Sequence, residues 1–299
     1  MKCTLCPHSC RADRTDTLGF CQAGPEPEAA TVCIHRGEEP PLSGRRGICN
    51  IFFTHCNMQC IYCQNRDISH PGGTAPARFQ GVEAIADQVA AILPGTENVV
   101  GLVSPSHYAD SIPALVQALH RRGLHPTIVY NTGGYDRVET LRALAPYVDV
   151  YLPDFKYMDP MLALRYSHAP DYPQVALAAL REMYNQKGSS LPTDDDGLAW
   201  RGIIVRHLVL PGQVENSLAV LDALADISPN LHVALMAQYY PPVESLPDQL
   251  GRTLTADEYR RVTDHLAAVG LSRGWVQELD AQANYRPDFT RQEAFEPKA

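Results

Sequence analysis

Three cysteines within a short loop give this sequence its clearest chemical feature. Cys56, Cys60 and Cys63 lie in the segment HCNMQCIYCQN, with the spacing C-x3-C-x2-C. A closed zinc site takes four ligands, and an electron-transfer iron–sulfur cluster is usually held by four thiolates. Three thiolates can hold three irons of a 4Fe-4S cluster and leave the fourth iron open for a substrate or cofactor. An open coordination position is typical of metal sites that carry out chemistry.

Two other interpretations of this loop stay open. A zinc ion completed by His55 or His70 is compatible with the spacing, because C-x3-C is looser than the usual C-x2-C knuckle but within its range. Three buried core cysteines are the other reading, and the polar residues that flank the loop disfavour it.

A second group of cysteines stands at the start of the chain with the spacing C-x2-C-x3-C-x10-C. It comprises Cys3, Cys6, Cys10 and Cys21. Gly19 permits a tight turn just before the last of them. The group predicts a closed metal site, which is either a structural zinc knuckle or a second 4Fe-4S cluster acting as an electron relay, since both accept four thiolates. We expect Cys33 and Cys49 to be small buried residues.

Composition limits the classes of partner and compartment. The 299 residues carry a net charge of −9 and no cluster of lysines and arginines, which argues against nucleic-acid binding. The first residues have no apolar segment of a signal peptide, and no apolar run is long enough for a membrane helix. We therefore expect a cytoplasmic protein with no membrane partner, in a compartment that keeps thiols reduced.

Residues 48–280 alternate apolar runs with helical patterns, as in repeated βα units. We expect strands at 48–53, 98–104, 126–132, 148–154, 201–212 and 230–241, with a short seventh at 274–279. We expect helices at 82–93, 111–123, 136–146, 172–188, 214–227 and 255–270. Thr255 is the predicted N-cap of the last helix.

Strict alternation predicts parallel strands and an α/β fold. Six units fit a partial (βα)6 TIM-like barrel, residues 48–280, with a small cysteine-rich metal-binding extension at 1–47 and a polar, extended tail at 281–299. An open doubly wound sheet is the alternative. Both architectures place ligands at the carboxyl ends of the strands, where the loop of Cys56 lies.

With these residues in place, the sequence resembles the radical S-adenosylmethionine (SAM) superfamily. The resemblance rests on C-x3-C-x2-C directly after the first strand and on Tyr62 before the last cysteine. From about residue 48 to about residue 240 it is similar to activases of glycyl-radical enzymes. Over the whole chain it resembles a branch described as similar to pyruvate formate-lyase activating enzyme.

The resemblance implies a cofactor set and partners. Cys56, Cys60 and Cys63 would hold a 4Fe-4S cluster, and SAM would chelate the open iron. The reduced cluster would cleave SAM to methionine and a 5′-deoxyadenosyl radical that abstracts hydrogen. It also implies a reductant such as flavodoxin or ferredoxin and, for an activase, a glycyl-radical protein as substrate.

The resemblance further implies contacts at the strand ends. Tyr62 would pack beside the nucleoside, and Lys156 would contact SAM. Asn131, Thr132 and Asp154 would contact SAM or hold a monovalent cation, although Asn131 stands where the activases have aspartate.

Other strand ends match the family less closely. The segment VSPSHY lacks the usual Gly-Gly-Glu, so Ser104, Ser106 and His107 are the candidates that would replace it. Strand alternation sends only one of Arg206 and His207 inward, and the activase pattern favours Arg206. The last candidates are Gln238, as a polar SAM contact, and the acidic segment 193–197, which we interpret as a solvated loop.

Several functions are compatible with these residues. The first is a radical SAM enzyme of the activase kind, and its variant modifies a small molecule or a peptide. A non-catalytic iron–sulfur electron carrier and a zinc-stabilised binding module are the others. Three cysteines rather than four at the ligand edge of the sheet disfavour the last two.

Overall fold

The computed structural model describes residues 2–283, 286–291 and 294–295. Its centre is a mostly parallel sheet whose nine described strands follow the order β3-β1-β2-β4-β5-β6-β7-β8-β9. The strands are β1 Glu28–His35, β2 Ile48–Phe53, β3 Phe79–Gln80, β4 Val99–Val103, β5 Thr127–Thr132, β6 Val150–Pro153, β7 Gly202–Leu208, β8 His232–Met236 and β9 Arg273–Val276. The pairs from β2 to β9 are parallel, whereas β1 pairs antiparallel with both β2 and β3. The predicted α/β class is confirmed, and the sheet is not closed.

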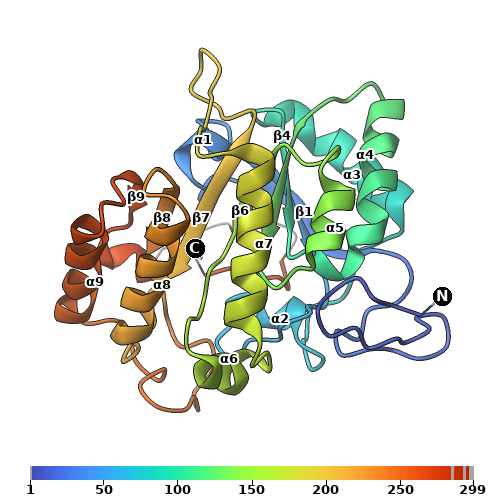
Figure 1. The fold of residues 1–299 in the computed structure, drawn as a ribbon. Coiled ribbons are helices and arrows are strands. Elements are labelled where there is room, and N and C mark those ends of the chain that lie inside the picture. The colour runs from blue at the N-terminus through green and yellow to red at the C-terminus, as the bar shows by residue number, and fades with distance from the viewer. Residues whose placement is uncertain (1, 284–285, 292–293, 296–299) are drawn as a thin grey trace.

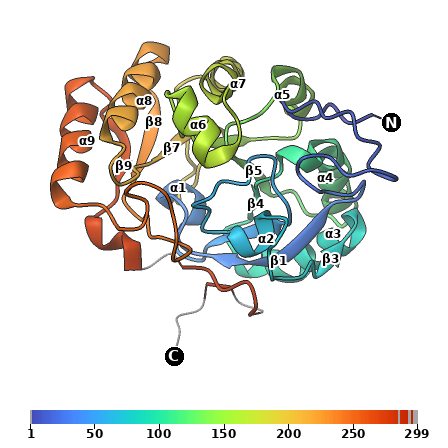
Figure 2. The same ribbon diagram turned by 90° about the horizontal axis from the view of Figure 1, so that it is seen from below.

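The helices of the described residues are α1 Pro40–Ser43, α2 Arg66–Ser69, α3 Val82–Ile92, α4 Ile112–Arg121, α5 Val138–Leu144, α6 Pro160–Ser167, α7 Tyr172–Lys187, α8 Val214–Ile227 and α9 Ala256–Ala268. The longer ones alternate with the parallel strands and cover the outer side of the curved sheet (Figures 1 and 2). Three 3-10 turns complete the set, at η1 Leu93–Gly95, η2 Ser106–Ser111 and η3 Leu279–Ala283. The predicted cap of α9 is confirmed, because Thr255 forms a capping box with Glu258.

The two faces of the sheet bury different clusters, as strand alternation requires. On β2, Cys49 and Ile51 face the helices and belong to the large outer core. Ile48 faces the opposite, inner side and packs with Leu42 of α1 and with residues of five other strands. The predicted burial of Cys33 and Cys49 is confirmed, with exposures of 1% and 0%.

The segments that follow β1 and β2 lie at opposite ends of the sheet. Because β1 is antiparallel to β2, its last residue, His35, pairs with Ile48, the first residue of β2. The segment after β1, with α1, therefore lies at the amino ends of the parallel strands. The loop after β2, with α2, lies at their carboxyl ends. Figure 1 shows α1 and α2 at these opposite ends.

Two parts of the chain differ from the sequence prediction. No strand was expected before residue 48, yet β1 extends the sheet there. The tail was expected to be extended, but its described part turns back on itself, with the Asp288 amide donating to the Ala294 carbonyl at 2.8 Å. Phe289 is only 1% exposed, because it packs on Phe52 from β2. Residues 284–285, 292–293 and 296–299 of the predicted tail lie outside the described residues.

None of the helices in the described part of the chain is long and apolar enough to span a membrane.

Candidate functional site

The three-cysteine loop begins immediately after β2 and opens onto the inner side of the sheet. Cys56, Cys60 and Cys63 all line one pocket there. Asp154 and Lys156, from the segment after β6, and Arg206, from β7, line the same pocket. The predicted clustering of these residues at one site is therefore seen in the structure, and it brings together segments about 150 residues apart.

Each of the three sulfurs accepts a hydrogen bond from a different donor. The Met58 amide donates to Cys56 Sγ at 3.4 Å. The Ser167 hydroxyl donates to Cys60 Sγ at 3.0 Å, and the Ser69 hydroxyl donates to Cys63 Sγ at 3.3 Å. Donors aimed at sulfur stabilise thiolate character, which metal binding requires.

Burial opposes this effect. It raises the pKa of Cys60 to about 12, while the Lys156 ammonium and the Ser167 hydroxyl act in the opposite direction. Burial also raises the pKa of Cys56, and the neighbouring Cys63 adds to the rise. Three thiolates here therefore need a positive partner to lower the cost of their charge.

A buried chain of hydroxyl groups supports Cys60. The hydroxyl groups of Tyr62 and Tyr157 are 2.6 Å apart, and that of Tyr157 is 2.7 Å from Ser167 Oγ. Ser167, the last residue of α6, then donates to Cys60. Tyr62 thus lines the pocket with its ring while its hydroxyl group is fixed within the core.

Arg206 is the centre of the polar network in the pocket. Its Nε donates to Asp154 Oδ1 at 2.9 Å, its Nη2 to Asn131 Oδ1 at 2.6 Å, and its Nη1 to Glu38 Oε2 at 3.2 Å. Lys156 donates to the second oxygen of Asp154. Burial favours the neutral acid, but Lys156 and Arg206 outweigh it and hold the pKa of Asp154 below its usual value.

Glu38 reaches Arg206 from the opposite end of the pocket. Its other oxygen accepts a hydrogen bond from Asn50 Nδ2 at 2.8 Å. Asn50 fits because its neighbour on β4 is Gly101, where a Cβ atom would lie 1.9 Å from Asn50 Oδ1. The glycine inside a predicted strand is thus explained by close packing against this network.

The pocket ends near the amino ends of the parallel strands, at His35, Glu38 and Glu39. Sequence reasoning missed all three: His35 ends β1, a strand that was not predicted, and GEEP reads as a loop with no recognisable spacing. Burial raises the pKa of Glu39 to about 7, with Arg206 lowering it and Glu38 raising it. Glu39 Oε2 and His35 Nδ1 are buried atoms with no hydrogen-bond partner.

The remaining predicted contacts divide into two groups. Ser104, Ser106, Asn131, Thr132 and Gln238 line the pocket. His107 does not, because its buried ring lies with Nε2 2.8 Å from the Thr54 carbonyl oxygen. His207 faces the outer core, between the Phe155 carbonyl and the Ser217 hydroxyl, so Arg206 is the inward residue of the pair as predicted.

His55 and His70, the predicted fourth ligands of a zinc site, line a different recess together with Glu28. His55 Nε2 lies 3.5 Å from a carboxylate oxygen of Glu28. In the described part of the chain, no three His, Cys, Asp or Glu side chains form a ready-made group that could hold a metal ion.

The amino-terminal segment, which carries Cys3, Cys6, Cys10 and Cys21, contacts the three-cysteine loop. Burial raises the pKa of Cys6 to about 12, and the thiols of Cys21, Cys3 and Cys10 raise it further. Gly19 is required because a Cβ atom there would lie 2.4 Å from Cys10 Sγ.

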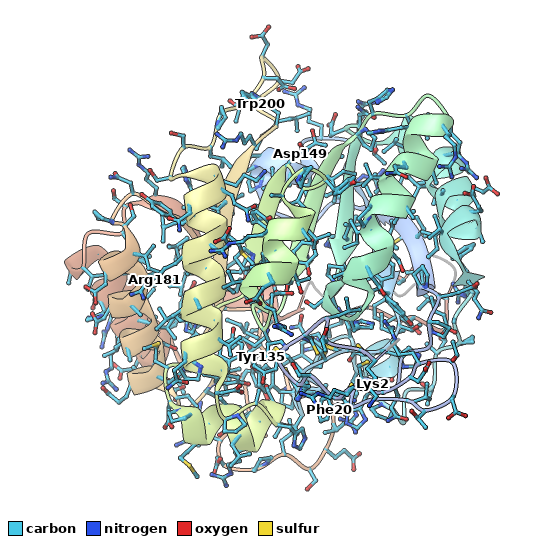
Figure 3. All side chains as sticks on the ribbon, turned by 45° about the vertical axis from the view of Figure 1, so that its right-hand side comes forward. Lys2, Phe20, Tyr135, Asp149, Arg181 and Trp200 are labelled. Atoms are coloured by element: carbon cyan, nitrogen blue, oxygen red, sulfur yellow. The ribbon has the colours of Figure 1, made fainter. Side chains whose placement is uncertain are left out.

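Two hydrogen bonds join this segment to the loop. His8 Nε2 lies 2.7 Å from the Asn57 carbonyl, and Gln59 Nε2 donates to the Phe20 carbonyl at 2.7 Å. The His8 ring also contacts the rings of Phe20 and Tyr135, two residues labelled near each other in Figure 3.

Comparisons with known proteins add a relative without a described function. No protein-family profile matches this chain. A protein of Methanocaldococcus jannaschii, named only as uncharacterized, is 26% identical over 272 residues, which cover 88% of this chain and 73% of that protein. The similarity extends through most of the chain and assigns no activity.

Proposed function

We propose that this protein is a radical SAM enzyme similar to the activases of glycyl-radical enzymes, and that its open sheet is a partial (βα)6 TIM-type barrel. The observation that carries the proposal is the environment of the three cysteines. They come from one loop at the carboxyl end of β2, each accepts one hydrogen bond, and all line a pocket whose wall carries charged and polar side chains.

The donor set fits a 4Fe-4S cluster better than a single ion. In a cluster each cysteine binds its own iron, so three sulfurs need not converge on one point as the ligands of one ion do. When bound and reduced, the cluster supplies the electron that cleaves SAM to methionine and a 5′-deoxyadenosyl radical. Lys156 lowers the electrostatic cost of the thiolates, since its ammonium acts on both Cys60 and Cys63.

The polar wall supplies groups for SAM. Lys156 and Arg206 are cations facing a pocket where a carboxylate can bind, and Ser104, Thr132 and Gln238 offer polar atoms near the same strand ends. Tyr62 offers an aromatic ring for the nucleoside. Asn131 and Asp154 are engaged with Arg206, which leaves fewer of their oxygens for a monovalent cation.

The test is reductive cleavage of SAM by the anaerobically reconstituted full chain, followed as 5′-deoxyadenosine. We expect product from the wild type and from Cys49→Ala, whose cysteine lies in the outer core, but none from Cys60→Ala. If a chain with a filled cluster binds SAM and forms no product, an iron–sulfur electron carrier becomes the better reading. Failure to bind SAM at all would overturn the proposal.

Two kinds of hydrogen donor fit this proposal: a glycine of a partner protein, and a small molecule or peptide. A reductant such as flavodoxin or ferredoxin would serve either reaction. Incubation with deuterated candidate substrates, with deuterium measured in 5′-deoxyadenosine, separates these donors.

A further inference from the structure

We propose that the end of the pocket remote from the cysteines is a binding position for a protonated amine or guanidinium group, carried by the second substrate. Calling the bound molecule a substrate rests on the proposed function, whereas the binding test described below does not depend on it. It is argued from the charges that face the pocket and from two buried atoms that have no partner.

The charges of the network are balanced without Glu39. Lys156 and Arg206 are the cations, and Asp154 is hydrogen-bonded to both. Glu38 completes the pairing through Arg206 Nη1. Glu39 lines the same pocket and is the surplus carboxyl group, and its Oε2 is buried with no hydrogen-bond partner. A buried acceptor of this kind is costly unless a ligand or water satisfies it.

A second residue points to a ligand at the same place. His35 is 8% exposed, lines the same pocket near Glu38, and its Nδ1 has no partner. The aromatic rings of Phe52 and Phe295 lie against it, the latter with its centroid 4.3 Å away. Carboxylate oxygen, imidazole nitrogen and aromatic rings together favour a cation that carries hydrogen-bond donors.

The proposed cation position and the cysteines lie at opposite ends of the parallel strands. Glu38 and Glu39 follow β1 and precede α1, at the amino ends of the parallel strands. The cysteines follow β2, at the carboxyl ends. A SAM molecule held at the cysteines would direct its amino and carboxylate groups to that end, so a cation at Glu39 would belong to another molecule. The shared chemistry is a primary ammonium or a guanidinium, either on a small amine or on a lysine or arginine of a peptide.

The probe for the test is n-butylammonium, with n-butanol as the uncharged control of similar shape. Binding to the anaerobically purified full chain is followed by NMR line broadening of the probe, without SAM or reductant. We expect the ammonium to bind at least about tenfold more tightly than the alcohol, a difference of about 1.4 kcal/mol. Glu39→Gln should abolish the preference, and Glu244→Gln, at an exposed carboxylate, should keep it.

The wild type alone provides an independent readout, in case Glu39→Gln fails to fold. The charged groups that act on Glu39 are Arg206, Glu38 and Asp154, and His35 lines the same pocket. Burial lowers the pKa of His35 below its usual value and raises that of Glu39 to about 7. The ionised carboxylate binds the probe, so affinity for n-butylammonium should rise about tenfold from pH 6 to pH 8. Butanol affinity should stay constant.

Equal binding of amine and alcohol, or a pH-independent amine affinity, would overturn the inference whether or not the protein cleaves SAM. If the preference holds, acetyl-lysine-amide (acetylated on the α-nitrogen) and a Gly-Lys-Gly peptide identify the source. If the peptide binds at least about tenfold more tightly than butylammonium, the cation is assigned to a peptide side chain. If the peptide gains less than this over butylammonium, the cation is assigned to a small amine.

Discussion

Arg206 and Asp154 contact each other just beyond the regular pairing of β6 with β7, with Arg206 Nε 2.9 Å from Asp154 Oδ1. Their backbones form an isolated parallel bridge one step beyond the end of β6. The pair therefore joins the two strands at the carboxyl edge of the sheet through both backbone and side chain. It also sets the direction in which Arg206 presents its remaining N–H groups to the pocket.

Asp154→Asn should strongly destabilise the protein. The substitution leaves Lys156 and Arg206 buried without their shared carboxylate, and breaking a buried ion pair from one side costs about 3–5 kcal/mol. Urea denaturation followed by circular dichroism measures the change. Asp257→Asn, which breaks an exposed pair with Arg260, is the control and should have a much smaller effect. Equal losses for the two variants would contradict a central role for Asp154.

The Asp154 carboxylate should also make the free energy of unfolding depend on pH. Lys156 and Arg206 outweigh burial and lower the pKa of Asp154 in the folded state. A group with a lowered folded pKa contributes its full stability above the unfolded pKa, about 3.9, and loses it as pH falls through the folded pKa. The difference in unfolding free energy between wild type and Asp154→Asn should therefore be constant from pH 7 to pH 5 and shrink below about pH 4. A difference that shrinks already between pH 7 and pH 5 would contradict this assignment.

Ser167→Ala should make the proposed cluster harder to reduce. The Ser167 hydroxyl donates to Cys60 Sγ at 3.0 Å, and hydrogen bonds to cluster sulfurs favour the more negative, reduced state. A hydrogen bond that stabilises the reduced cluster by about 1 kcal/mol more than the oxidised one raises the potential by about 40 mV for one electron, and Ser167→Ala should lower the potential by that amount. A redox titration followed by electron paramagnetic resonance measures it.

Two variants control for this result. Ser167→Thr keeps a hydroxyl group and should restore much of the potential. Ser217→Ala removes a buried hydroxyl that contacts His207 on the outer side of the sheet and should leave the potential unchanged. A Ser167→Ala potential within error of the wild type would mean that the hydroxyl does not act on the cluster.

The sequence predicted the parallel strands and the residues at their carboxyl ends, because apolar periodicity and strand alternation are local. Alternation required that only one of Arg206 and His207 face inward, and the resemblance to the activases selected Arg206. The donors to sulfur could not be found this way: Ser167 lies 107 residues from Cys60, at the end of an unpredicted helix. Glu38 and Glu39 were missed because their position depends on β1 running antiparallel to β2. Tertiary contacts determine that direction, and no local pattern in GEEP predicts it.

The amino-terminal cysteines should bind metal independently of the three-cysteine loop. Cys6 is buried and close to three other thiols, which suits four-thiolate coordination. Iron, zinc and acid-labile sulfide are measured per chain after anaerobic purification. A zinc site predicts about one zinc beside about four irons, and a second cluster predicts about eight irons.

Cys6→Ser separates this site from the other. It should remove the zinc, or about half of the iron, and keep the four irons assigned to the Cys56 loop. Cys49→Ala should change neither metal. A Cys6→Ser protein with the full wild-type metal content would show that the amino-terminal thiols are not ligands.

The carboxy-terminal tail should act as a wall of the pocket, and its removal should expose one particular cysteine. Cys33 on β1 is 1% exposed and packs in a cluster with Phe289 and Ala294 of the tail. Arg78 holds the tail by donating to the carbonyls of Phe289 and Thr290 at 3.2 and 3.1 Å. A chain that ends after residue 285 lacks all of these contacts.

In that truncated chain, we expect Cys33 to react with iodoacetamide much faster than in the full chain, because it loses the tail residues of its buried cluster. Cys49 on β2, which pairs with Ile34 and faces the outer core, is the internal control and should stay protected. Peptide mass spectrometry of the alkylated cysteines measures both in one sample. Phe289→Ala should give the same selective labelling to a smaller degree, since it loses one of the rings that pack on Phe52. Equal labelling of Cys33 and Cys49 would instead indicate general unfolding, and no labelling of either would show that the sheet closes without the tail.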